Sequence, residues 1–223
     1  SGVVASVLVD LDMDGTRDLV VLVSQESERL LVFRAAERAL SEPIQLFQGH
    51  PGYGFNGLTS ADVDGDGLID LIAVNGDNYD LDSGPLKPYH GIRIFYNQGA
   101  LRFSQPQFLP FHGAVDVLPG DFDLDGDTDL LALSSFPDYR VTPYESAVVF
   151  EQVDPGRFLP RAIEAAQGSR WVDAAALDLD GDGDQDFILI GAYSTLSEAD
   201  RRWSDLAGPQ PKTMLVLRNL TRR

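Results

Sequence analysis

One nine-residue motif, Asp-x-Asp-x-Asp-Gly-x-x-Asp, occurs four times in this chain of 223 residues and constrains its fold more than any other feature. The first copy spans residues 10–18, and the later copies begin at Asp62, Asp121 and Asp178. Successive copies therefore begin 52, 59 and 57 residues apart. Self-similarity at a nearly even period indicates a repeat architecture in which each repeat is one supersecondary unit.

Each copy of the motif lies between two stretches that are typical of β-strands. The stretch before it is apolar or alternating, and the run after it is short and rich in Val, Ile and Leu, as in 19–23. Such runs, bounded by turn formers, favour short buried strands over helices. A third strand is predicted at 30–33, 92–96, 147–150 and 214–217, and a fourth near 43–47, 103–109 and 158–163.

Four short strands per repeat predict an all-β fold, namely a β-propeller of four-stranded blades with four blades in this chain. Residues 1–223 would form a single propeller or a propeller segment. The expected blades are 3–49, 50–110, 111–166 and 167–220, and the last of them lacks a predicted outer strand.

The acidic side chains of the motif are candidate metal ligands. Side chains at alternate positions of a loop point the same way, so positions 1, 3 and 5 converge, which several carboxylates tolerate around a cation. Ligation by oxygen alone favours Ca²⁺ over Zn²⁺, and up to four ions are expected. Further ligands are expected from the Asp at position 9 and the backbone carbonyl at position 7. The predicted ligands are Asp10, Asp12, Asp14, Thr16 and Asp18; Asp62, Asp64, Asp66, Leu68 and Asp70; Asp121, Asp123, Asp125, Asp127 and Asp129; and Asp178, Asp180, Asp182, Asp184 and Asp186.

An EF-hand calcium loop begins with the same letters but differs at position 12. An EF-hand requires a bidentate Glu there and a helix on each side. Position 12 of the four copies is apolar and lies within a predicted strand, as Val21, Ala73, Ala132 and Leu189. The motif is therefore interpreted as a loop that joins two strands.

Composition excludes several partners and chemistries. The net charge is −18, with 35 acidic residues against 17 Lys and Arg, and 16 of the acids belong to the motif. Nucleic acid and anionic membranes are poor partners for such a surface. There is no Cys, and no apolar run is long enough to span a membrane. The first residues already read as a strand, so a leader peptide is expected to lie outside this sequence.

The residues of the motif resemble those of a known repeat family. Residues 61–67 (Ala-Asp-Val-Asp-Gly-Asp-Gly) and 179–184 (Leu-Asp-Gly-Asp-Gly-Asp) are similar to FG-GAP or VCBS repeats, the calcium-loop propellers also found in integrin α-subunit heads. The resemblance covers residues 3–220. Residues 86–95 and 136–139 further resemble a bacterial VCBS subgroup that is often secreted or associated with respiratory and cytochrome proteins.

The resemblance implies an extracytoplasmic protein, whether periplasmic, secreted or on the cell surface. Propellers of this family usually have seven or eight blades, so four blades imply that the ring is completed by self-association, by a second chain or by further sequence. A four-blade ring closed within this chain is the other alternative.

Long connections between the second and third strands are the expected binding surface. They span 75–91, 134–145 and 191–212 and would emerge on one side of the propeller. Loops on a rigid scaffold commonly carry binding residues, and aromatic side chains are common at protein and carbohydrate contacts. The alternative is that these aromatic side chains pack on their own blades. The residues in question are Tyr79, Tyr89, Tyr139, Tyr144, Tyr193 and Trp203.

The sequence predicts a binding or scaffold module for a protein or carbohydrate, and not an enzyme. The three histidines, His50, His90 and His112, lie on different segments without a second ligand at metal spacing. Catalysis by paired carboxylates needs one differentiated pair, whereas these acids recur in four equivalent copies. The alternative is a non-catalytic propeller part of a polysaccharide-active enzyme or of a respiratory or cytochrome-associated complex.

Overall fold

A computed structural model describes residues 2–36, 39–78, 86–138, 141–142, 144–192 and 212–221. These residues form four antiparallel sheets, and the helical structure among them is the 3₁₀ turn Glu164–Ala166. The described part of the chain therefore has an all-β fold, as predicted.

Each sheet is built from strands that follow one another along the chain and pair with their sequence neighbours. Sheet 1 contains β1 (Gly2–Val9), β2 (Asp18–Ser24), β3 (Arg29–Phe33) and β6 (Ile44–Gln48), with a two-stranded ribbon of β4 (Ala35–Ala36) and β5 (Ala39–Leu40) beside it. Sheet 2 contains β7 (Phe55–Ala61), β8 (Asp70–Asn75), β9 (Gly91–Phe95) and β10 (Gln107–Pro110). Sheet 3 contains β11 (Ala114–Gly120), β12 (Asp129–Ser134), β13 (Ala147–Asp154) and β14 (Arg157–Ala162). Sheet 4 contains β15 (Trp171–Leu177), β16 (Asp186–Gly191) and β17 (Met214–Leu217).

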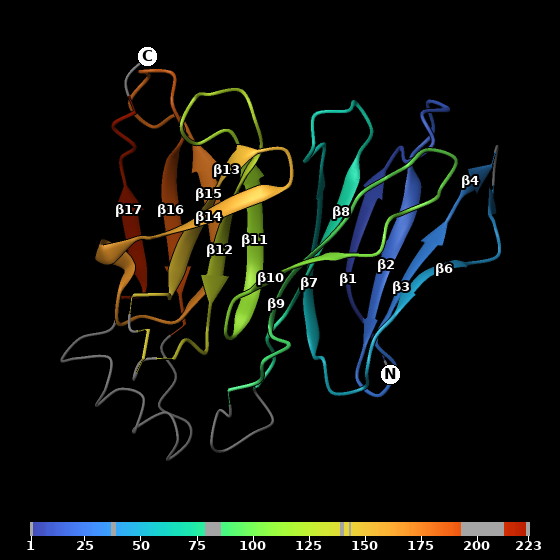
Figure 1. Cartoon of the computed structure of the whole chain (residues 1–223), viewed down its shortest axis with the longest axis horizontal. Helices are drawn as coiled ribbons and strands as arrows, with labels where there is room; N and C mark the ends of the chain where they lie inside the picture. Colours follow the sequence, from blue (N-terminus) through green and yellow to red (C-terminus); the bar gives the residue numbers. More distant parts are fainter. Residues whose placement is uncertain are drawn as a thin grey trace.

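The four sheets stand in a row in chain order (Figure 1). The first strand of each sheet contacts the first strand of the next, in the series β1, β7, β11 and β15. Sheets 1 and 4 lie at opposite ends of the long axis, so the described residues form an open row (Figure 1). Radial stacking through first strands is compatible with propeller blades, but the ring itself remains a prediction.

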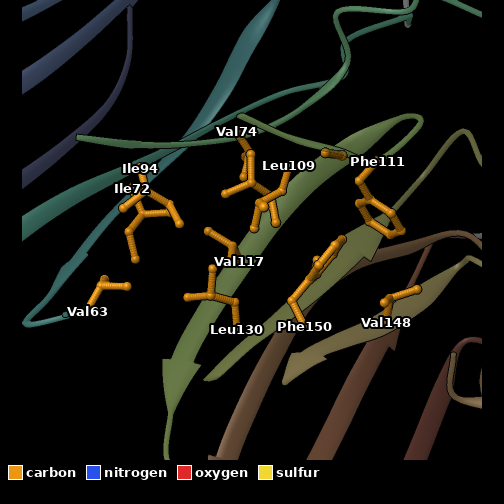
Figure 2. Close-up of a cluster of buried hydrophobic side chains, with 13 residues drawn as sticks. Val63, Ile72, Val74, Ile94, Leu109, Phe111, Val117, Leu130, Val148 and Phe150 are labelled. Atoms are coloured by element: carbon orange, nitrogen blue, oxygen red, sulfur yellow. The ribbon is translucent and has the colours of Figure 1, made fainter. Parts of the chain in front are cut away.

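Three apolar layers hold the row together, one between each pair of neighbouring sheets. In sheets 2 and 3 the second strand is apolar at nearly every position, because one set of alternate residues packs on the sheet before and the other on the sheet after. In sheet 2, Ile72 and Ile94 face each other in register and pack toward sheet 3, where Leu130 and Phe150 meet them (Figure 2). This explains why the sequence shows continuous apolar runs rather than alternation.

The two ends of the strands carry different connections. The four acidic loops join the first and second strands and lie along one edge of the row, at the top of Figure 1. Antiparallel pairing sends the connections between second and third strands to the opposite edge. Tyr89 and Tyr144 belong to the described residues, and Tyr89 stacks on Tyr53 with 5.4 Å between ring centroids. Tyr79, Tyr139, Tyr193 and Trp203 lie outside the described residues.

Candidate metal centres

Each acidic loop brings three carboxylates together, and the predicted convergence of positions 1, 3 and 5 is present in loops 1 and 2, whereas Asp125 and Asp182 at position 5 are not in the groups of loops 3 and 4. We number the loops by their sheets: loop 1 is residues 10–18, loop 2 is 62–70, loop 3 is 121–129 and loop 4 is 178–186. In every loop one oxygen from each of three Asp lies within 4.8 Å of the others. The converging groups are Asp10, Asp12 and Asp14; Asp62, Asp64 and Asp66; Asp121, Asp123 and Asp129; and Asp178, Asp180 and Asp186. The converging carboxylates thus come from positions 1, 3 and 5 in loops 1 and 2, and from positions 1, 3 and 9 in loops 3 and 4.

The loop backbone is folded around the carboxylate at position 1. In all four loops this carboxylate accepts a hydrogen bond from the N–H of the Gly at position 6, at 2.8 to 3.2 Å. That Gly has a positive φ each time, a conformation that other residues adopt at a cost. The φ values are 85° at Gly15, 90° at Gly67, 98° at Gly126 and 94° at Gly183. The Gly of the motif is therefore required by the turn.

The residue at position 7 makes a backbone hydrogen bond that was not predicted from the sequence. Its N–H donates to the carboxylate at position 5 in every loop, at 2.8 to 3.2 Å. Its expected role as a carbonyl ligand remains a prediction. In loops 3 and 4 the residue is itself acidic, and the side chains of Asp127 and Asp184 stand beside the other carboxylates of their loops. Burial and the neighbouring Asp125 and Asp129 raise the pKa of Asp127 to about 7.

The Asp at position 9 begins the second strand and is buried in all four sheets. One oxygen accepts the N–H of position 2 of its own loop, and the other accepts an N–H from the end of the third strand, two residues beyond it in sheets 1, 2 and 4 and within β13 in sheet 3. These donors and distances are Leu11 (3.3 Å) and Ala35 (2.9 Å) for Asp18; Val63 (2.8 Å) and Asn97 (2.8 Å) for Asp70; Phe122 (3.0 Å) and Gln152 (2.8 Å) for Asp129; and Leu179 (2.9 Å) and Asn219 (2.8 Å) for Asp186. Position 9 therefore ties the loop to the sheet, whether or not it also binds a metal.

A carboxamide side chain connects each of sheets 2, 3 and 4 to the acidic loop of the sheet before it. The residue whose backbone N–H bonds to position 9 also donates its side-chain N–H to the position-2 carbonyl of the preceding loop; it lies two positions beyond the third strand in sheets 2 and 4 and within β13 in sheet 3. We call this contact the carboxamide latch. The three latches run from Asn97 to Leu11 O (2.9 Å), from Gln152 to Val63 O (2.9 Å) and from Asn219 to Phe122 O (2.7 Å). Sequence reasoning missed them, although Asn or Gln recurs at this place in three repeats.

Several loop oxygens are buried without a hydrogen-bond partner among the described residues. They include Oδ1 of Asp12, Asp121 and Asp127 and both carboxylate oxygens of Asp184, a residue that is 2% exposed. A buried carboxylate oxygen without a donor is costly unless a cation satisfies it. Burial accordingly raises the pKa of Asp64, of Asp123 and of Asp184, and it raises that of Asp70 to about 6. The donor set is all oxygen and rich in carboxylate, which fits a hard cation such as Ca²⁺.

Comparison with known families agrees with this geometry. The model of the FG-GAP-like repeat matches residues 10–73 and again 62–132, which together make up more than half of the chain. The chain belongs to the FG-GAP-like repeat family. Each match begins at the first Asp of an acidic loop and extends past the next one, so the FG-GAP unit takes in the loops that the structure places along one edge.

Other comparisons add less. Comparison with curated proteins gave no match. Among solved structures, the crystal structure of the V. cholerae biofilm matrix protein Bap1 is similar, with 18% sequence identity and a TM-score of 0.48. The match covers 83% of this chain and 23% of that chain, so this chain spans less than a quarter of Bap1's length. The described residues contain no helix with the length and hydropathy needed to cross a bilayer.

The carboxamide latch can be tested by replacing Asn97 with Asp. Asn97 is 2% exposed; its amide donates to Leu11 O in loop 1 and to Ile69 O in loop 2, and its carbonyl accepts from the Gly99 N–H. Asn97→Asp keeps the shape and the acceptor but turns an oxygen toward the Leu11 carbonyl. We expect the free energy of unfolding in urea to fall by about 1–3 kcal/mol, the cost of a buried polar group left unpaired. The exposed neighbour Gln98 offers the same amide-to-acid change as a control, and equal effects of Asn97→Asp and Gln98→Glu would contradict the latch.

The raised pKa values predict how stability depends on pH when no metal is bound. A carboxyl whose pKa is higher in the folded than in the unfolded state binds protons on folding, so stability rises as the pH falls. In EDTA, the melting temperature should therefore rise between pH 8 and pH 5.5, through the pKa of about 7 at Asp127 and about 6 at Asp70. Asp127→Asn should flatten the part of this dependence near pH 7. A melting temperature that falls steadily with acidification would refute the prediction.

Proposed function

We propose that the chain is a calcium-stabilised, non-catalytic binding or scaffold module of an extracytoplasmic protein. The observation that supports this most is the repetition of the acidic loop. Four loops of one design each gather carboxylates within a few ångströms, and loops 1, 3 and 4 also contain buried oxygens that have no donor among the described residues. Calcium would satisfy these oxygens and brace the two strands that each loop joins, and its binding energy would add to the stability of the fold.

Calcium would be held by the same residues that the motif indicates. The Asp at positions 1 and 3 lie in the converging group of every loop, joined by position 5 or position 9. Calcium outside cells is present at millimolar concentration and suits sites of modest affinity. Family membership supports an extracytoplasmic location, where such sites would be filled.

The row of sheets is proposed to be a segment of a β-propeller. In sheet 2, the residues that face the next sheet are fully buried, among them Ile92 and Ile94. Their register equivalents in sheet 4, Met214 and Val216, are 65% and 49% exposed. A contiguous apolar face of this kind supports a partner surface. A further sheet, from the same polypeptide, a second copy or another chain, would cover it and extend the ring.

Ligand binding is assigned to the edge opposite the acidic loops, where the long connections leave the sheets. The acidic loops are nearly equivalent to one another, and repeated equivalent sites suit a structural ion better than a specific partner. The connections 75–91, 134–145 and 191–212 differ in length and sequence, which suits recognition of one protein or carbohydrate. Four equivalent carboxylate groups also offer no differentiated acid and base, which supports a non-catalytic role.

Calcium should raise the melting temperature of the chain. At about one hundred times a site's dissociation constant, an ion contributes about 2.7 kcal/mol, or roughly 5–10 °C for a domain of this size. The double substitution Asp64→Ala and Asp66→Ala should remove the contribution of loop 2. Asp154→Ala removes one surface acid that pairs with Arg157 and belongs to none of the converging groups, and it serves as the charge control. Identical melting curves in calcium and in EDTA would refute calcium binding.

The binding proposal can be tested with an array of neutral and acidic polysaccharides. We expect the calcium-loaded chain to bind at least one polysaccharide and to release it at its original length, since no catalysis is proposed. Replacing 193–211 with a Gly-Ser linker of equal length should abolish binding without changing the calcium-dependent melting temperature. Binding that survives replacement of all three connections would place the ligand surface elsewhere, and shortened polysaccharide would indicate an enzyme.

A further inference from the structure

The four acidic loops differ at one register position of the third strand, namely the residue directly after the one that pairs with the second residue of the second strand. These partners of the second residue of the second strand are Phe33, Phe95, Phe150 and Leu217, which pair with Leu19, Leu71, Leu130 and Phe187. Each of the four residues that directly follow these partners therefore stands beside the acidic loop of its own sheet. They are Arg34 in sheet 1, Tyr96 in sheet 2, Glu151 in sheet 3 and Arg218 in sheet 4.

In sheet 1 this residue forms ion pairs with two candidate ligands of loop 1. The Nε of Arg34 lies 2.6 Å from Asp12 Oδ2, and a terminal guanidinium nitrogen lies 3.3 Å from Asp14 Oδ2. The side chain of Asp12 is 10% exposed, so this pair is partly shielded from water. A guanidinium is always charged and can contact two carboxylates at once, which lets it neutralise a small acidic group. Loop 1 therefore already contains a cation supplied by the chain.

The corresponding residues of sheets 2 and 3 are directed to their own outer strands. The hydroxyl of Tyr96 donates to Gln107 Oε1 at 2.6 Å, and the carboxylate of Glu151 pairs with Arg161 at 2.8 Å. Neither residue brings a positive charge to its loop. The acids of loops 2 and 3 are thus left to be neutralised by an ion from solution.

Sheet 4 has an arginine at this place, but its contact is weaker. A guanidinium nitrogen of Arg218 lies 3.4 Å from Asp180 Oδ2, and the Arg218 side chain is 67% exposed. An exposed single contact at this distance contributes little. Loop 4 also has an additional carboxylate in Asp184, whose two oxygens are buried without a donor among the described residues.

The charged residues within the loops also separate loop 1 from the other three loops. Loops 3 and 4 each contain five Asp, and loops 1 and 2 each contain four. Position 8 is Arg17 in loop 1, whereas it is uncharged in the other loops, as Ile69, Thr128 and Gln185. Loop 1 therefore has four Asp, as loop 2 does, together with Arg17 in the loop and Arg34 beside it. A divalent cation there would have to compete with Arg34 for Asp12 and Asp14.

We propose that loop 1 is braced by Arg34 in place of a divalent cation, and that loops 2, 3 and 4 are the calcium sites. The inference rests on the proposed calcium binding and assigns it to three loops of the four. Arg34 is thus the residue that lowers the calcium affinity of loop 1, which we expect to be roughly tenfold weaker than after removal of its charge.

The glycine amides of the loops provide a site-resolved test by ¹H–¹⁵N NMR. Each of Gly15, Gly67, Gly126 and Gly183 donates its N–H to the first Asp of its own loop, so its chemical shift reports on that loop. During a CaCl₂ titration, the Gly67, Gly126 and Gly183 signals should move and saturate at calcium concentrations below those at which the Gly15 signal moves. In Arg34→Gln, the Gly15 signal should also move, with a midpoint lowered by roughly tenfold.

A control variant and a second measurement separate the outcomes. Arg157→Gln removes the same charge from a surface pair that contains no acid of the four loops and should titrate like the unmodified chain. The rise in melting temperature from EDTA to calcium should be larger in Arg34→Gln than in Arg157→Gln. If Gly15 already titrates with the other three in the unmodified chain, or is unaffected by Arg34→Gln, the assignment to three loops is wrong. If none of the four glycines responds in any variant, calcium binding itself is refuted and this inference fails with it.

Discussion

The structure depends on a buried carboxylate that recurs at the start of the second strand of every sheet. Asp18, Asp70, Asp129 and Asp186 are each at most 1% exposed, and each accepts two backbone N–H bonds from separate segments. A charge buried this deeply is tolerated because both oxygens are paired. The same two bonds hold the acidic loop on one side and the end of the third strand on the other. Removing this carboxylate would leave two buried N–H groups without an acceptor, which makes it the least replaceable member of the motif.

The carboxylate at position 9 links each acidic loop to the packing between neighbouring sheets. In sheet 2, the amide of Asn97 bonds to Asp70, and the side chain of the same residue bonds to Leu11 in loop 1. Leu11 is fully buried in the apolar layer between sheets 1 and 2. At the opposite edge, Glu28 of sheet 1 is 1% exposed and accepts the N–H of Phe55 in sheet 2. Neighbouring sheets are thus joined by buried polar contacts at both edges, with an apolar layer between them, so an ion that orders a loop also orders an interface.

Much of this could be predicted from sequence, because it depends on local patterns. The strands coincide with short apolar runs between turn formers, and the acids converge because alternate loop positions share one direction. The carboxamide latches could not be found this way, since Gln152 and Asn219 look like ordinary polar residues after a strand until the preceding loop is placed beside them. Arg34 was overlooked for a similar reason, because it lies 20 residues beyond Asp14 and meets it through strand pairing. Whether the row of sheets closes into a ring could not be predicted from local patterns either, because the second and third strands are apolar in every repeat, including the first and the last.

The carboxamide latches all run the same way along the row, from each sheet to the acidic loop of the sheet before it. Sheets 2, 3 and 4 each reach back to the preceding loop with Asn97, Gln152 and Asn219, whereas the equivalent residue of sheet 1 is Ala35, which has no side-chain donor. At the other end of the row, Leu179 stands at position 2 of loop 4 and is 42% exposed, whereas its equivalents in loops 1 to 3 are at most 5% exposed. A sheet with Asn or Gln after its third strand can therefore join the row on the side of sheet 4 by repeating the contacts seen three times already. Any sheet that meets sheet 1 must do so without the latch from Ala35, so the contact on that side differs in chemistry from every other contact in the row.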